Sequence, residues 1–211
     1  GNEALFEELR HDPKTLVLST DAAPDLVEEF GEQRIRATPI AEAAVTGMAI
    51  GAAGSGYRPI VNWRIVTFSF VAMDQIVNQA SKIHYMFGGQ AKFPILFRAT
   101  VGGGGKLAAQ HSQSPYSMFM NLAGLKIILP STPYDMKGLM KSAIRDDNPV
   151  ISFESSRLMG FKGDVPDEEY TLPIGKADVK REGKDVTIVA IAWLVHEALA
   201  AAETLAQEGI S

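Results

Sequence analysis

The 211-residue sequence contains no cysteine. This absence excludes disulfide bonds, thiolate nucleophiles and zinc sites with cysteine ligands. It also fits a reducing compartment, so we expect a cytoplasmic protein. This sequence therefore has no cysteine side chain that could act in catalysis.

Clustered positive charge and long apolar runs are also lacking. The chain has 20 Lys and Arg against 25 Asp and Glu, a formal net charge of -5 and a pI near 5.4. Nucleic-acid binding depends on clustered basic residues that neutralise phosphates, and the absence of a basic stripe argues against it. The best candidate for a membrane span, 37–57, contains Glu42, Thr46 and repeated glycine, which argues against a bilayer helix.

The chain does contain apolar runs of strand length that alternate with longer helical patterns. The runs are rich in Val, Ile, Leu and Phe, which is typical of buried parallel strands. Strands are predicted at 15–19, 59–65, 95–100, 126–129 and 150–153, and helices at 40–55, 68–85 and 133–145. The alternation predicts an α/β fold, a parallel sheet with helices on both faces. Ligands should then bind outside the carboxyl ends of the strands.

The composition becomes polar after residue 155, with several Gly and Pro residues and an acidic run at 164–169. We therefore divide the chain into a domain at 1–155, a linker at 156–184 and the start of a second α/β domain at 185–211. The last part is predicted to contain one strand, 186–192, and one helix, 195–208. Two elements are too few to close a core, so we expect the chain to be a piece of a longer protein.

Glu42 is the most informative residue of the first domain. It follows Thr38-Pro39-Ile40-Ala41 and opens a predicted helix of small and aliphatic residues that has no further charge until Arg58. Backbones or a flat ligand can approach such a helix closely. We expect the helix and Glu42 to be buried, which suits a carboxyl group that shares a proton with a ligand. The alternative is a helix-start acid whose partners are backbone amides.

Two further features follow the predicted strand 95–100. The run Gly102-Gly103-Gly104-Gly105-Lys106 resembles a phosphate loop, but Thr100 and Leu107 stand where that motif needs glycine and a hydroxyl residue. We interpret the run as a loop that forms a wall of the active site. His111 comes shortly after it, where an imidazole can present a proton to a substrate. His84 and His196 lie in helical stretches, where a surface position or core packing is expected.

Several stretches together resemble one family, the beta subunits of the thiamine-diphosphate-dependent decarboxylating component of 2-oxoacid dehydrogenase complexes. This family includes pyruvate, branched-chain 2-oxoacid and acetoin dehydrogenases. The most specific stretches are T-P-I-A-E at 38–42, D-Q-I-V-N-Q-A at 74–80, Y-M-F-G-G at 85–89, A-Q-H-S-Q-S at 109–114, K-G-L at 137–139 and A-I-R-D-D-N-P at 143–149. The resemblance runs from about Asn2 to Ser211, and details such as Phe87 favour the acetoin branch.

The resemblance implies roles for three site residues. Glu42 matches the glutamate that hydrogen-bonds the aminopyrimidine ring of the cofactor and favours the tautomer that activates it. Phe68 matches the aromatic side chain that stacks on the same ring, although a core phenylalanine is the alternative when the residues are considered alone. His111 matches the histidine that lines the substrate channel and assists substrate binding or acyl transfer to a lipoyl group.

The resemblance also implies ions and partners. Ile95, Ala143, Ile144, Asp146 and Asn148 match positions that hold potassium in some members, mainly through carbonyl oxygens. In the family, Mg2+ and the diphosphate are held by a Gly-Asp-Gly motif on an alpha subunit, and that motif does not occur in this sequence. The implied partners are an alpha subunit in an α2β2 assembly, a lipoyl-bearing acyltransferase, and a small 2-oxoacid or acetoin as the substrate.

Three departures from the family pattern lie near the expected cofactor face. Asn62 replaces a usual acidic residue, Ser19-Thr20-Asp21 replaces Gly-Glu-Asp, and the segment 21–25 is shorter than the family loop. They are compatible with an altered substrate, or with an inactive subunit that assembles with its partner without catalysing. The central domain of a transketolase-like enzyme shares the fold and a glutamate, but the match through His111 and Asp146 disfavours it.

Overall fold

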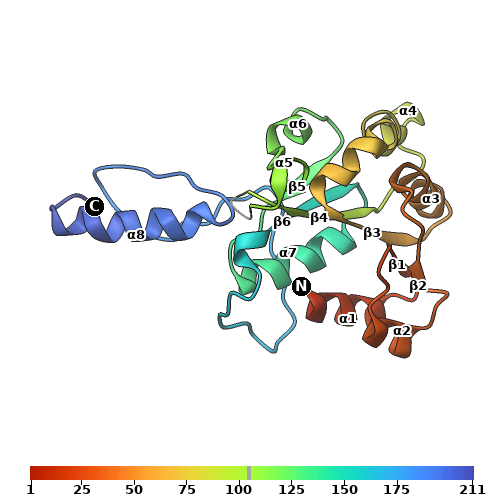
Figure 1. Cartoon of the computed structure of the whole chain (residues 1–211), viewed down its shortest axis with the longest axis horizontal. Helices are drawn as coiled ribbons and strands as arrows, with labels where there is room; N and C mark the ends of the chain where they lie inside the picture. Colours follow the sequence, from red (N-terminus) through yellow and green to blue (C-terminus); the bar gives the residue numbers. More distant parts are fainter. Residues whose placement is uncertain (104–105) are drawn as a thin grey trace.

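A computed structural model describes residues 1–103 and 106–211 of the chain (Figure 1). Within these residues the centre is a six-stranded sheet in the order β2-β1-β3-β4-β6-β5, and every neighbouring pair is parallel. The strands are β1 (Thr15–Ser19), β2 (Ile35–Ala37), β3 (Arg58–Ile65), β4 (Leu96–Val101), β5 (Lys126–Ile128) and β6 (Val150–Ser155). The predicted α/β fold is confirmed.

The helices pack on both faces of this sheet, apart from the last one, which projects away from it (Figure 1). They are α1 (Asn2–His11), α2 (Pro24–Phe30), α3 (Glu42–Gly54), α4 (Ile83–Met86), α5 (Ala108–His111), α6 (Tyr116–Met120), α7 (Pro133–Arg145) and α8 (Leu194–Gln207), with the 3-10 helices η1 (Val66–Ala72) and η3 (Ser156–Leu158) and the π-helix η2 (Gln75–Ala80). One core lies between the sheet and α1, α2 and α7, and the other between the sheet and α3, η1, η2 and α6 (Figure 1). Because helices cover both faces of the sheet, the side chains on both sides of the strands are buried, which explains why the strand sequences are apolar.

The helix α7 begins and ends where the sequence predicts. The Thr132 hydroxyl accepts a hydrogen bond from the Asp135 backbone N–H at 3.0 Å, and the Asp135 carboxylate accepts one from the Thr132 N–H at 3.1 Å. Burial raises the pKa of Asp135, but hydrogen bonds led by that of the Ser131 hydroxyl outweigh this and hold the pKa below its ordinary value. The reciprocal capping box therefore fixes the start of α7.

The prediction of a single helix at 68–85 is wrong. The chain instead forms η1, η2 and α4, three short helices of different hydrogen-bond pattern. The start of this region, Val66 to Val71, is rich in β-branched and aromatic residues, which lose side-chain freedom in an α-helix. Packing of Val66, Ala72, Ile76 and Ala80 into the core holds the irregular turns in place.

The predicted strand 186–192 is also wrong, whereas the helix predicted beside it, 195–208, is confirmed as α8. Residues 186–191 have no regular structure, and Val189 is 89% exposed. A strand needs a neighbour to pair its backbone groups, and this segment instead runs along a projection that leaves the sheet domain together with α8 (Figure 1). The sequence shows an apolar run of strand length, but it does not show whether a neighbouring strand is present to pair with it.

The segment that follows β6 is fastened to α7 before it reaches α8. The Tyr170 ring stacks on the Tyr134 ring with centroids 4.6 Å apart, and the Ser142 hydroxyl donates to the Leu172 carbonyl at 2.5 Å. A Cβ on Gly138 would lie only 2.7 Å from side-chain atoms of Tyr170 and Leu172. The absence of a side chain at Gly138 therefore allows this close packing. The division into domain, linker and second domain stays a prediction.

In the described ranges, no helix combines the length and the apolar character needed to cross a bilayer.

Candidate active site

The residues predicted to form the site lie at the edge of the sheet where the strands have their carboxyl ends. Glu42 is the first residue of α3, Phe68 lies in η1 directly after β3, and His111 ends α5 after β4. The helix α3 contacts both β3 and η1, and α5 contacts η1. Three loops that are far apart in the sequence therefore meet at the edge where parallel sheets bind ligands.

Phe68 and His111 are in direct contact. Their ring centroids lie 5.4 Å apart and the rings are perpendicular, the edge-to-face arrangement that aromatic rings favour. Beside them, the Thr67 hydroxyl donates a hydrogen bond to the Gln110 carbonyl at 2.5 Å. Both rings are only partly buried, so each keeps a surface that a ligand can reach.

A close backbone contact positions the segment that carries His111. The Gly102 N–H, just after β4, donates to the Gln113 carbonyl at 3.3 Å. A Cβ built on Gly102 would lie 1.8 Å from the His111 carbonyl oxygen, far inside contact distance. Glycine at this position is thus a steric requirement. The predicted site wall also includes Gly104 and Gly105, which lie outside the described residues.

We expect Gly102→Ala to displace His111 and lower turnover, because the added methyl group cannot fit beside that carbonyl. The kcat of the assembled enzyme should fall by about tenfold or more, since small misplacements of a catalytic group are costly. Gly56→Ala is the stability control: Gly56 has a φ of 89° and open space around it, so this change strains the backbone away from the site. Equal kcat values for Gly102→Ala and wild type would show that the contact does not position His111.

The expected burial of Glu42 and its helix is only partly correct. The helix α3 buries one face, which includes Val45 and Ala49, but Met48 is 47% exposed and Glu42 itself is half-buried. The Trp63 indole N–H donates to the Thr46 hydroxyl at 3.1 Å inside the core and pins α3 to β3. The small residues pack one face against the sheet, and the other face of α3 is open to a ligand or to a second chain.

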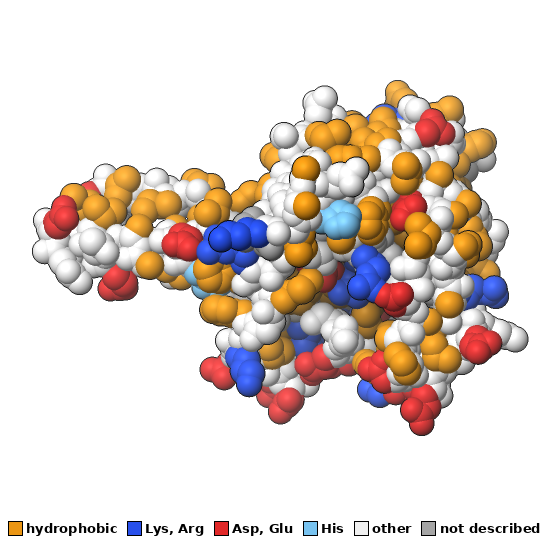
Figure 2. Space-filling view, in the orientation of Figure 1, with side chains coloured by type: hydrophobic (Ala, Val, Ile, Leu, Met, Phe, Trp, Pro, Cys, Tyr) orange, Lys and Arg blue, Asp and Glu red, His pale blue; other side chains and the backbone are white. Residues whose placement is uncertain are grey.

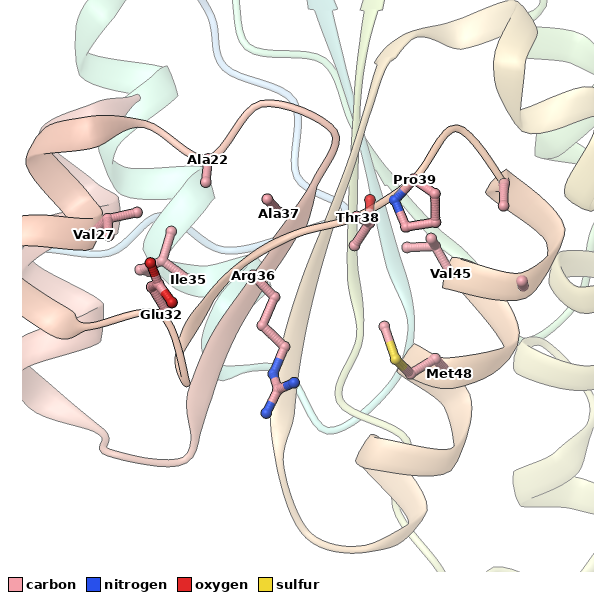
Figure 3. A pocket seen from close by; sticks show the side chains of 12 residues that line it. Ala22, Val27, Glu32, Ile35, Arg36, Ala37, Thr38, Pro39, Val45 and Met48 are labelled. Atoms are coloured by element: carbon pink, nitrogen blue, oxygen red, sulfur yellow. The ribbon is translucent and has the colours of Figure 1, made fainter.

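A cavity of about 570 Å³ lies beside the start of α3 (Figure 3). It is lined by residues of α2, β2 and α3, mostly small and apolar, with Glu32 and Arg36 as the charged members. Ala41, directly before Glu42, and Ala44, two residues after it, belong to its wall, whereas Glu42, Phe68 and His111 do not. The three site residues therefore lie outside this cavity.

Two of the departures from the family pattern act as local turn caps. The Asn62 side-chain oxygen accepts from the Arg64 backbone N–H at 3.0 Å, and the Ser19 hydroxyl accepts from the Asp21 N–H at 3.3 Å. Asn62 and Ser19 are neighbours in the pairing of β1 with β3. The Ser19 bond thus shapes the start of the loop after β1, whereas the Asn62 bond lies within β3, where its register against β4 shifts.

The residues matched to a potassium site lie at the opposite edge of the sheet, where β4 and β6 begin. Ile95 directly precedes β4, and Ala143 and Ile144 belong to the last turn of α7. One guanidinium nitrogen of Arg58 donates to the carbonyls of Ile144 at 3.2 Å and Asp146 at 3.1 Å. Carbonyl oxygens at a helix C-terminus attract cations, so the donor set suits a hard cation, although Arg58 already faces two of its oxygens.

The side chains of the same segment are also paired. Burial raises the pKa of Asp146, but hydrogen bonds from Lys126 and Asn148 outweigh it and hold the pKa below the ordinary value. The carbonyl of Ile95 accepts from the Val150 N–H at 2.8 Å. A carbonyl has two lone pairs, so these oxygens keep acceptor capacity.

His84 and His196 serve packing or surface contacts, as predicted. His196 packs on Phe161 and Trp193, with its Nε2 2.8 Å from the Ser131 carbonyl. His84 is exposed and its Nδ1 lies 2.6 Å from the Ala91 carbonyl. Neither belongs to the site edge.

Comparison with known families agrees with this geometry. The model of the "Transketolase, pyrimidine binding domain" family matches residues 2–161, and that of the "Transketolase, C-terminal domain" family matches 175–211. A solved split gene transketolase, titled an inactive beta4 tetramer, superposes with a TM-score of 0.82 at 25% identity, covering 99% of this chain and 66% of that one. A transketolase from Pichia stipitis gives a TM-score of 0.64 at 20% identity, covering 94% of this chain and 31% of that one, which shows the fold alone. The fold and site edge therefore define a pyrimidine-binding domain of the transketolase type.

Relatives of known sequence narrow this class. The chain is 47% identical to the 2-oxoisovalerate dehydrogenase subunit beta of Bacillus subtilis, covering 100% of this chain and 67% of that protein. It is 45% identical to the acetoin:2,6-dichlorophenolindophenol oxidoreductase subunit beta of Cupriavidus necator (99% and 67%), and 43% identical to the mitochondrial pyruvate dehydrogenase E1 component subunit beta of Dictyostelium discoideum (100% and 63%). The chain belongs to the family of beta subunits of thiamine-diphosphate-dependent 2-oxoacid and acetoin dehydrogenases, and spans about two thirds of the length of these relatives.

Proposed function

We propose that this chain is the beta subunit of a cytoplasmic, thiamine-diphosphate-dependent dehydrogenase. Its substrate is a 2-oxoacid, such as pyruvate or a branched-chain 2-oxoacid, or acetoin, and the acyl group passes to a lipoyl group on an acyltransferase. The observation that supports the proposal is the contact of Phe68 with His111 at the carboxyl edge of the sheet, beside the helix α3 that Glu42 begins, in a chain of this family.

Each of these three residues has a task that its position supports. When bound, thiamine diphosphate supplies the carbon nucleophile that attacks the substrate carbonyl. Glu42 shares a proton with the aminopyrimidine ring, Phe68 offers a π-face to that ring, and the His111 imidazole exchanges a proton with the substrate. The half-exposed positions of the three side chains suit a cofactor that lies across the edge.

Magnesium belongs to the alpha subunit in this proposal. Across the two described ranges, no three His, Asp or Glu side chains form a group that could hold a metal ion. Potassium is proposed for the opposite edge, at the carbonyls near the end of α7. Its ligands would be the acceptor sites that Arg58 leaves open on Ile144 and Asp146, together with oxygens of Ile95, Ala143 and Asn148.

Exposed apolar side chains support a requirement for an alpha subunit. Ile40, before α3, is 84% exposed, Tyr85 and Phe87 around α4 are 87% and 58% exposed, and Val71 of η1 is 67% exposed. Figure 2 shows hydrophobic side chains gathered on this part of the surface, above α3 and α4 as placed in Figure 1. Large exposed apolar side chains that gather on one part of a surface are typical of a protein interface. We propose that an alpha subunit covers it and completes the site in an α2β2 assembly.

The test is cofactor binding by the full-length chain with and without its alpha subunit. In a calorimetric titration, we expect thiamine diphosphate with Mg2+ to bind only when both subunits are present. Phe68→Ala should weaken that binding by about tenfold, because an aromatic stack contributes roughly 0.5–1.5 kcal/mol beyond the area it buries. Phe68→Tyr keeps the ring and should bind nearly as wild type does. Tight binding by the beta chain alone, or equal affinities of Phe68→Ala and wild type, would contradict the proposal.

A further inference from the structure

Arg64, near the end of β3, has an unusual backbone conformation. Its φ of 64° lies in the left-handed region that non-glycine residues rarely adopt. The register of β3 against β4 shifts between Asn62 and Ile65, and the Asn62 side chain holds the turn by accepting the Arg64 N–H. An irregularity of this kind re-aims a side chain next to a functional site. The strained backbone at Arg64 therefore sets the direction of this arginine side chain near the end of β3.

The placement of Arg64 connects it to the site edge. Ile65 ends β3 and Phe68 follows three residues later in η1, so Arg64 lies on the strand that leads to the proposed stacking ring. Its guanidinium pairs with the carboxylate of Asp21, in the loop after the neighbouring strand β1. Lys106 and Ala108, after β4, also have positive φ values, so strain gathers in loops at this same edge.

The ion pair between Arg64 and Asp21 is weak enough for another carboxylate to take the place of Asp21. The side chains of Arg64 and Asp21 are 52% and 64% exposed, and ion pairs in such high-dielectric surroundings are weak. A guanidinium binds a carboxylate through two parallel hydrogen bonds, and the carboxylate of a small ligand can replace that of Asp21. A neutral ligand has no group with which to compete.

We propose that Arg64 sets the substrate class of this subunit by binding the carboxylate of a 2-oxoacid at the mouth of the site, where Asp21 holds the guanidinium in the absence of substrate. This assignment rests on the function proposed above. It makes acetoin, which has no carboxylate, a poorer substrate than a 2-oxoacid. Under the competing interpretation, the Arg64 to Asp21 pair only braces the short loop after β1.

The two interpretations differ in the sign of the effects. If substrate and Asp21 compete for Arg64, Arg64→Gln raises KM for 2-oxoacids by about tenfold, and Asp21→Asn lowers it by a few fold. Arg64→Lys keeps the charge without the planar fork and should lie between Arg64→Gln and wild type. The KM for acetoin should change little in all three variants. A brace would instead make Arg64→Gln and Asp21→Asn alike, with the same shift for charged and neutral substrates.

The experiment measures KM and kcat for pyruvate, a branched-chain 2-oxoacid and acetoin, using full-length chain assembled with its alpha subunit and cofactor. Arg36→Gln is the matched control, because it removes the same charge from an exposed position on β2, two strands away from β3. Opposite KM shifts confined to 2-oxoacids support the assignment. Equal shifts for acetoin, no shift, an equal effect of Arg36→Gln, or turnover of acetoin alone overturn it while the proposed function stands. Wild-type enzyme silent toward every substrate overturns both.

Discussion

Glu42→Gln is expected to lower kcat of the assembled, cofactor-loaded enzyme by at least about a hundredfold, which is the lower end of the effect of losing a positioned acid or base. Glutamine keeps the size of the side chain and its place at the first residue of α3, but an amide cannot give and take the proton that the aminopyrimidine ring requires. Steady-state kinetics with saturating thiamine diphosphate and Mg2+ measure the effect.

Folding should survive this change. A carboxylate in the first turn of a helix contributes roughly 0.3–1 kcal/mol through the helix dipole, so the loss of stability is small. Glu28→Gln, an exposed position on α2, is the control for removal of one negative charge. If Glu42→Gln keeps more than half of the wild-type kcat, Glu42 is a helix-start acid and its assigned role is wrong.

Arg145→Ala is expected to destabilise the fold by about 2–4 kcal/mol, slightly less than the loss of a partner from a fully buried ion pair. Arg145 donates to both oxygens of Glu8, at 2.8 and 2.5 Å, and the Glu8 side chain is only 2% exposed. Without Arg145, a buried carboxylate loses its cation. Because Arg145 itself is 35% exposed, the expected loss of stability lies in the lower part of the range for buried ion pairs.

This pair belongs to a ladder of charges that joins α1, α7 and the segment after β6. Cations at four-residue spacing on α7 face carboxylates of α1 and of that segment: Lys137, Lys141 and Arg145 face Glu3, Glu7, Glu8 and Glu169. Hydrogen bonds from Lys141 and Arg145 lower the pKa of Glu169. A lowered pKa contributes stability that is complete above the unfolded value of about 4.3 and is lost as pH falls through the folded value. Measurements near pH 7 therefore include the full contribution of Glu169.

Thermal unfolding of the assembled protein at pH 7 is the measurement for Arg145→Ala, with an expected decrease in Tm of about 5–10 °C. Arg10→Ala removes an exposed arginine that pairs with Glu29 on the surface, and should leave Tm unchanged within error. The double variant Glu8→Leu with Arg145→Met removes both charges and should recover much of the loss. A decrease in Tm no larger than that of Arg10→Ala would show that the pair adds nothing.

Much of this fold could be predicted from local sequence, because its main signals are local. The runs at 15–19 and 150–153 are apolar on both faces, as a covered parallel sheet requires, and Thr132 with Asp135 supplies a complete cap for α7. The membership of the family also followed from ordered motifs such as T-P-I-A-E at 38–42, and the comparisons confirm it.

The features that the sequence does not predict have a different physical origin, since each depends on residues that are far away in the sequence. The three-residue β2 is too short to show a period, and the segment 186–192 has a strand pattern without a pairing strand. The half exposure of Glu42 reflects which neighbours α3 has, and composition alone does not show them. The sequence does not single out Arg64, because an arginine at a strand end has the pattern of a solvated charge and its positive φ is visible only in three dimensions.

The formation of acyl-lipoyl product in a single turnover is the most direct measurement of the function of this chain. Full-length chain assembled with its alpha subunit, thiamine diphosphate and Mg2+ would be mixed with pyruvate, a branched-chain 2-oxoacid or acetoin and a lipoyl acceptor. We predict product from at least one substrate, only when both subunits are present, and none above background with Glu42→Gln. An assembled, cofactor-loaded complex that forms no product from any of the three would contradict this prediction and identify an inactive or repurposed subunit.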